Sequence, residues 1–321
     1  MISRRTFLVA SAGAGAGLLL AACGSSGGES AGTDGTDDGG GTEASTGTET
    51  AATDAGGGSV AEHDLSADGY DIVRRFSTTS LVPGTLRMPI SLADAGQLLT
   101  DPSEGPDELS GWIVDESGAV VADGLTASKR SEGLPNAYWA FTAELTEPGL
   151  YTLFIDGGTP DGSALQVNDP ASVAIPLVGD PLPPVATPTV SDHAGVDPIC
   201  THDPECPLHD ITLTDALATG KPVAYLIGTP AYCQTGVCGP ILDLLLELRD
   251  DEFGEDIVFV HADVYADETL QEVAPAVTAY QLDFEPVLFV TDSAGVLSTR
   301  LDAVFDKSEM RDAIEMALGI S

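Results

Sequence analysis

The segment VAYLIGTPAYCQTGVCGP, residues 223–240, is the most informative about the fold of the C-terminal third of this chain. It opens with five apolar residues, Val223–Ile227, which predict a strand buried on both faces. A turn follows, and the proline in Pro240–Arg249 suits the first turn of a helix. Two cysteines, Cys233 and Cys238, are therefore expected between the end of a buried strand and the start of a helix.

The residues around this stretch predict helices and strands that alternate. Outside it, we expect a helix at Thr212–Ala218, a strand at Ile257–Ala262, a helix at Leu270–Tyr280, a hairpin of Pro286–Thr291 with Val296–Leu301, and a closing helix at Ser308–Leu318 capped by Ser308. This alternation predicts an α/β domain, and the final hairpin makes its sheet mixed.

This order of elements resembles the thioredoxin fold over residues 210–321. The segment Phe284–Val290, FEPVLFV, resembles the part of thioredoxins that carries a cis-proline beside the redox cysteines. The resemblance implies a cis bond before Pro286, which would present its backbone to the substrate. It also implies thiol–disulfide exchange through Cys233 and Cys238, with protein thiols or disulfides as partners and no cofactor.

The spacing of the two cysteines departs from that family, because four residues separate them where thioredoxins have two. Residues five apart point about 140° away from each other on a helix, so the loop must bulge, and Gly236 offers the freedom for it. In one alignment Cys233 attacks and two residues are inserted. In the other, Cys238–Ile241 matches Cys-Gly-Pro-Cys, so Cys238 lies at the start of the helix, Ile241 replaces the second cysteine, and Cys233, which precedes it in the chain, resolves the mixed disulfide. The first is favoured, because Cys233 directly follows the strand and its turn.

A second group of cysteines and histidines precedes the domain, with the spacing Cys-x-His-x3-Cys-x2-His from Cys200 to His209. This spacing is compatible with zinc or copper. Outside the cytoplasm, however, two nearby cysteines usually form a disulfide, so we predict a Cys200–Cys206 bridge. A relay of disulfides with the first pair is a third alternative. His261 lies in an apolar strand and is expected to be a core residue rather than a ligand.

The N-terminus resembles an export signal of a bacterial lipoprotein. The segment Ser3–Leu8 holds paired arginines, a short apolar run follows, and Leu20–Cys23 resembles a lipobox. We therefore expect residues 1–22 to be removed and Cys23 to carry a lipid anchor, which places the chain on the outer face of the cell membrane. A plain secretory signal or a retained helix are the alternatives.

Two further segments are predicted to be spacers. Residues 23–60 consist largely of small and acidic residues, which cannot form a core and predict a disordered tether. Residues 179–209 are rich in proline and are expected to form an extended linker that also holds the second pair of cysteines.

Residues 66–178 predict an all-β domain, because short strands between Asp71 and Leu177 are separated by turn residues. The segment Glu147–Tyr151 resembles the tyrosine corner of immunoglobulin-like sandwiches. There the Tyr151 hydroxyl would bond back to the backbone, and Trp112 or Trp139 would fill the core.

The chain is strongly acidic, with 51 acidic residues against 12 basic ones. Such a charge repels nucleic acid and anionic headgroups, so neither is an expected partner. A saline habitat or a device for solubility would explain it. Besides thiol–disulfide exchange, two functions remain open: a surface adaptor whose cysteine pairs are structural and whose β domain binds a partner, and, less favoured, copper delivery, for which His261 is the one available histidine.

Overall fold

A four-stranded mixed sheet forms the centre of the C-terminal part of the computed structural model, which describes residues 63–101 and 103–320. The strands are β9 (Val223–Ile227), β10 (Val258–Ala262), β11 (Val287–Thr291) and β12 (Leu297–Asp302), in the order β10-β9-β11-β12. Strand β10 is parallel to β9, whereas β11 is antiparallel to both β9 and β12. This is the α/β arrangement that the resemblance to thioredoxins implies, so that prediction is confirmed.

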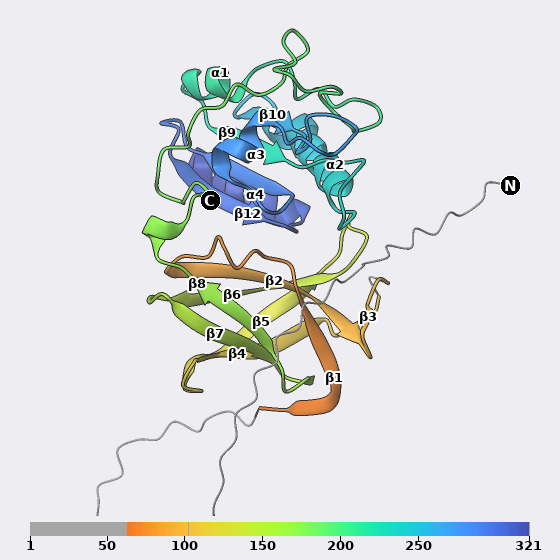
Figure 1. Ribbon diagram of the computed structural model, residues 1–321, viewed down its shortest axis with the longest axis vertical. Coiled ribbons are helices and arrows are strands. Elements are labelled where there is room, and N and C mark those ends of the chain that lie inside the picture. Colours follow the sequence, from red (N-terminus) through yellow and green to blue (C-terminus); the bar gives the residue numbers. More distant parts are fainter. Residues whose placement is uncertain (1–62, 102, 321) are drawn as a thin grey trace, which may run out of the picture. The chain divides into compact units, whose positions relative to one another are not determined.

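Helices cover both faces of this sheet (Figure 1). They are α1 (Leu213–Ala218), α2 (Cys238–Leu248), α3 (Pro275–Tyr280) and α4 (Lys307–Leu318). Leu242 of α2 and Ile314 of α4 belong to one apolar core, and Leu213 of α1 and Tyr280 of α3 belong to the other. Covering on both faces explains why all residues of β9 and β11 are buried and why both strands are continuously apolar. Within the described residues, no helix has the length and apolar character needed to cross a membrane.

Three helix boundaries differ from the sequence-based expectation. Helix α2 begins at Cys238, and a π-helical turn, η2 (Arg249–Phe253), extends it. Helix α3 begins only at Pro275, which suits its first turn, and Leu270 has a φ of 58°, which a right-handed helix excludes. The cap of α4 is Asp306, whose carboxylate accepts the Glu309 amide, and not Ser308. Ser308 instead donates its hydroxyl to the Asp306 carboxylate.

The preceding part of the chain is an eight-stranded sheet in which the paired strands run antiparallel. Its strands are β1 (Leu65–Arg74), β2 (Gly84–Asp94), β3 (Gln97–Leu98), β4 (Glu108–Asp115), β5 (Val120–Arg130), β6 (Tyr138–Leu145), β7 (Gly149–Ile155) and β8 (Ser163–Val167). The all-β prediction is therefore confirmed in outline, while the immunoglobulin-like type of the sheet stays a prediction.

The expected roles of individual residues in this sheet hold with one exception. The Tyr151 hydroxyl donates to the Glu147 carbonyl over 2.9 Å, and Trp139 is fully buried in the core. The last predicted strand, at Ser172–Leu177, does not form. A short 3-10 helix, η1 (Pro170–Ser172), occupies its start, because Pro170 fixes a helical φ there and the Asp169 carboxylate caps it.

The proline-rich segment 179–209 contains no helix or strand, yet it is not an exposed linker. Leu182 and Val185 pack into the core beside α1 and α3, and Ile199 and Leu208 pack into the core beside α2. The apolar residues between its prolines are buried, so the segment forms part of the α/β domain. The predicted signal 1–22, the lipid site Cys23 and the whole of the tether 23–60 lie outside the described residues.

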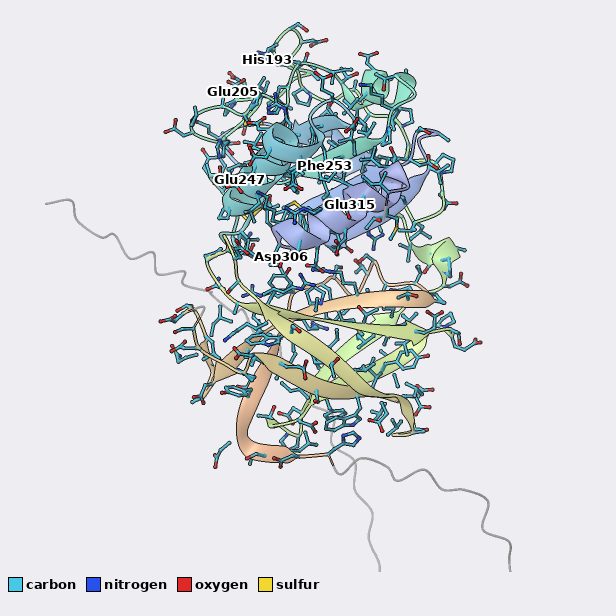
Figure 2. The ribbon with its side chains drawn as sticks, turned by 180° about the vertical axis from the view of Figure 1, so that it is seen from behind. His193, Glu205, Glu247, Phe253, Asp306 and Glu315 are labelled. Carbon is cyan, nitrogen blue, oxygen red and sulfur yellow. A yellow bond between two sulfur atoms is a disulfide. The ribbon has the colours of Figure 1, made fainter. Side chains whose placement is uncertain are left out.

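A buried ion pair joins β2 to α4. Arg87 Nε and Nη2 each donate to one carboxylate oxygen of Glu309 over 2.7 Å, and the Tyr138 hydroxyl donates to the same carboxylate. Arg130 makes a second pair with Asp306, which Figure 2 labels at the start of α4. These contacts connect the all-β part with the α/β part. Both parts belong to one compact unit.

Candidate active site

The loop between β9 and α2 holds the cysteine pair that the sequence predicts to be redox-active. Cys233 and Cys238 are joined by a disulfide, and their Cα atoms are 5.9 Å apart. This separation is usual for a disulfide. The bulge of the loop includes Gly236, whose φ of 71° favours glycine, as expected from the four-residue spacing.

The two sulfurs of this pair differ in their surroundings. Cys238, the first residue of α2, is only 1% exposed, whereas Cys233 is half-buried and lies in the loop. The Cys233 sulfur accepts the backbone N–H of Cys238 over 3.3 Å and lies 3.3 Å from the Thr235 hydroxyl. An amide at a helix N-terminus stabilises a nearby thiolate. Cys233 is therefore the sulfur that a partner can reach and whose negative charge the fold stabilises.

An acidic side chain, Glu285, lies beside the buried sulfur. Its Oε2 is 3.6 Å from Cys238 Sγ and accepts the backbone N–H of Thr229 over 2.7 Å. Burial raises the pKa of the Glu285 carboxyl, and the hydrogen bonds from Thr229 oppose this shift. A carboxyl in this position can take the proton of the Cys238 thiol once the disulfide is reduced. Glu285 was not among the site residues predicted from the sequence, although its place directly before Pro286 could have identified it.

Pro286 lies where the sequence predicts it, facing the cysteine pair. The Glu285–Pro286 peptide bond is cis, which confirms that prediction. A Cβ atom placed on Gly228 would lie 3.1 Å from Pro286 Cβ and 3.5 Å from Cys238 Sγ. Glycine at this position therefore lets the end of β9 pass between the proline and the buried cysteine. The structure thus brings together all three residues predicted to be catalytic.

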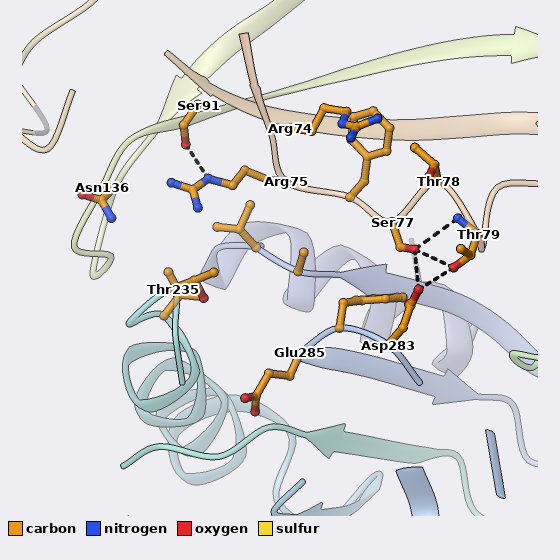
Figure 3. Close-up of a pocket in the computed structure, with 15 residues that line it drawn as sticks. Arg74, Arg75, Ser77, Thr78, Thr79, Ser91, Asn136, Thr235, Asp283 and Glu285 are labelled. Atoms are coloured by element: carbon orange, nitrogen blue, oxygen red, sulfur yellow. Dashed lines mark hydrogen bonds between the residues drawn. The ribbon is translucent and has the colours of Figure 1, made fainter. Parts of the chain in front are cut away.

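A pocket of about 350 Å³ opens beside the loop (Figure 3). Thr235 and Glu285 line it on the side of the cysteines, and Arg75 and Asn136 line it on the side of the strands. Arg75 donates from Nε to the Ser91 hydroxyl over 3.0 Å, which fixes the direction of its guanidinium group. The pocket therefore presents polar groups of both charges close to the loop that holds the pair.

The second group of thiols differs from its prediction. Cys200 and Cys206 are free and buried, so the structure does not contain the disulfide predicted for them. Instead, they form a buried cysteine–histidine cluster with His209 and His261. Both sulfurs lie close to the ring of His261, at 3.8 and 3.4 Å from its Nδ1.

Two histidines of this region differ in their relation to the cluster, and His261 is fully buried, as expected of a core residue. His202, which belongs to the sequence motif, lies outside the cysteine–histidine cluster and binds the Asp243 carboxylate over 2.9 Å. His261, expected to be a core residue, contributes Nδ1 to the cluster, and its Nε2 donates to the Gly228 carbonyl over 2.9 Å. Both of its ring nitrogens are therefore engaged away from Cys233, which removes the support for copper delivery through that loop.

Comparisons with known proteins identify no family for this chain, since no known protein family and no curated protein matches it. Among solved structures, a thiol:disulfide interchange protein of the thioredoxin family from Chlorobium tepidum is similar, with 15% identity and a TM-score of 0.32, covering 44% of this chain and 99% of its own. The filamin domain of Lin-41 is 17% identical with a TM-score of 0.22, covering 33% of this chain and 97% of its own. At these values, the function proposed below rests on the residues of this chain alone.

Proposed function

We propose that this chain is a thiol–disulfide exchange protein in which Cys233 attacks and Cys238 resolves. The observation that carries this proposal is the asymmetry of the disulfide, which joins a half-buried sulfur to a fully buried one beside Glu285. A disulfide that served only as a staple would need neither an accessible sulfur nor an acid next to the other one.

The exchange reaction needs only the two cysteines, Glu285 and a disulfide of the substrate. In the reduced protein, the Cys233 thiolate attacks a disulfide of the substrate, forms a mixed disulfide and releases one substrate thiolate. Glu285 then accepts the Cys238 proton, and the resulting thiolate attacks Cys233. The mixed disulfide breaks, the Cys233–Cys238 bond forms, and the second substrate thiolate leaves and takes up a proton. The substrate gains two electrons; the reverse sequence oxidises a dithiol.

We further propose that the protein acts from the outer face of the cell membrane, anchored through Cys23, with the all-β part as an immunoglobulin-like domain. Support for the anchor comes from the sequence motifs of residues 1–23. Support for the domain type comes from the Tyr151 corner and the buried Trp139.

The decisive test is the reduction potential of the Cys233–Cys238 pair in the full chain, measured by alkylation and peptide mapping after equilibration in redox buffers. For an exchange protein we expect a potential between about −270 and −120 mV, the range of known thiol–disulfide oxidoreductases. A potential below about −300 mV would instead indicate a structural disulfide and favour the hypothesis that the protein is a surface adaptor.

Glu285→Gln is expected to slow the resolving step and to change its dependence on pH. Because burial raises the pKa of Glu285 above its ordinary value, the wild-type rate should fall as pH decreases through that raised pKa, when the protonated carboxyl no longer accepts the Cys238 proton. The rate of the variant should lack this inflection and depend on pH only through ionisation of the Cys238 thiol. Stopped-flow reduction of a model disulfide between pH 4 and 9 measures both profiles.

The stability of the same variant provides the control. A carboxyl whose pKa is raised by folding contributes stability at low pH that is lost as pH rises through the raised value. Gln removes this loss and can still accept the Thr229 N–H. The variant should therefore be at least as stable as the wild type at neutral pH. A variant that is both slower and less stable would contradict a role in proton transfer.

A further inference from the structure

We propose that the cysteine–histidine cluster of Cys200, Cys206, His209 and His261 is a structural zinc site. The ligand atoms of the four residues all lie within 4.8 Å of one another, and all four side chains are buried. Two thiolates and two neutral imidazoles form a ligand set that structural zinc commonly takes, and two thiolates also neutralise the charge of the ion.

The distances within the cluster agree with tetrahedral coordination. A zinc ion with Zn–S bonds of about 2.3 Å and Zn–N bonds of about 2.05 Å holds sulfur and nitrogen roughly 3.6 Å apart and two nitrogens roughly 3.3 Å apart. The sulfurs of Cys200 and Cys206 lie 3.8 and 3.4 Å from His261 Nδ1, which is 3.3 Å from His209 Nε2. The three distances to His261 Nδ1 therefore match those of a zinc-binding tetrahedron, and the remaining pairs of ligand atoms lie within 4.8 Å.

The outer contacts of the cluster orient one of its rings for a metal. The Nε2 of His261 donates to the Gly228 carbonyl over 2.9 Å and lies 3.7 Å from the buried Asp263 carboxylate, so its Nδ1 is left without a proton and faces the sulfurs. In histidines that bind metals, the other ring nitrogen usually donates to a carbonyl or carboxylate, and this hydrogen bond fixes the tautomer. A bound ion would accept one lone pair from each imidazole and each thiolate of the cluster, whose side chains are buried away from water.

The position of the cluster indicates its purpose. Three of its ligands come from the segment 179–209, which has no helix or strand, and the fourth comes from β10. Four bonds to one ion would attach this segment to the sheet. The His261 ring also supports the carbonyl of Gly228, the residue that separates Pro286 from Cys238. Zinc would therefore stabilise the base of the active-site loop without taking part in exchange.

The test is the metal content of the full chain, purified without chelators from zinc-supplemented medium and measured by mass spectrometry of the elements. We expect about one zinc per chain in the wild type, and loss of that zinc in Cys206→Ser and His209→Ala. His202→Ala is the matched control, because this histidine belongs to the same sequence motif but binds Asp243, and it should retain the metal. Cys233→Ser should retain it as well, which separates this site from the proposed redox site.

A second measurement keeps the test valid if the ligand variants fail to fold. Cobalt substituted into the wild-type chain should give the intense visible absorption of tetrahedral Co²⁺ with thiolate ligands. Wild-type protein without zinc, with a Cys200–Cys206 disulfide in peptide maps, would overturn the proposal. Stoichiometric copper in place of zinc would overturn the assignment of the metal, and loss of zinc from His202→Ala would overturn the assignment of the ligands.

Discussion

Cys238→Ser should accumulate mixed disulfides with other proteins, whereas Cys233→Ser should accumulate none. Cys233 is half-buried and accepts an amide hydrogen bond at the start of α2, so it can attack, whereas Cys238 is 1% exposed and can act only after Cys233 has reacted. Removing the resolving thiol leaves the first intermediate without a route to product. We expect high-mass bands in the membrane fraction of Cys238→Ser that disappear on reduction.

The opposite pattern would assign attack to Cys238 and support the alignment of Cys238–Ile241 with Cys-Gly-Pro-Cys. Absence of adducts in both variants, together with a disulfide that resists dithiothreitol, would contradict exchange altogether. The wild-type chain serves as the control, because its Cys238 resolves the mixed disulfide and it should accumulate no adducts.

Glu309→Ala should destabilise the chain by about 3 kcal/mol or more, because it leaves a buried charge on Arg87 without its counter-ion. The pair is bidentate, with both N–O distances at 2.7 Å, and its side chains are only 18% and 12% exposed. The same change removes the acceptor of the buried Tyr138 hydroxyl. The free energy of unfolding of the full chain in urea, with its midpoint and slope, measures the effect.

Lys307→Ala is the matched control on the same helix. Lys307 pairs with Glu247 over 2.9 Å, but the Glu247 side chain is 55% exposed, and such pairs contribute at most about 1 kcal/mol. Equal losses of stability in both variants would show that burial of the Arg87 pair does not matter for the attachment of α4 to β2.

Much of the fold follows from local sequence. The continuous apolar run Val223–Ile227 and the later run in β11 predict buried strands, because only a sheet covered on both faces can accommodate them. Helix α1 was expected to start at Thr212, which caps it, since the Thr212 hydroxyl accepts the Asp215 amide. Helix α4 shows the limit of such rules: two residues able to cap it, Asp306 and Ser308, are two positions apart, and the cap is Asp306, whose carboxylate accepts the Glu309 amide.

The sequence was enough to predict the order of strands and helices, the cysteine pair in the loop after β9 and the proline that faces it, because each depends on neighbours in the chain. Contacts between groups far apart in the sequence could be identified only in the folded chain. His261 joins Cys200 across 61 residues, and Glu309 joins Arg87 across 222. Side-chain packing sets such contacts, and hydrophobic periodicity carries no information about them. For the same reason, the sequence predicted a bridge between Cys200 and Cys206, where the fold places two imidazoles beside two free thiols.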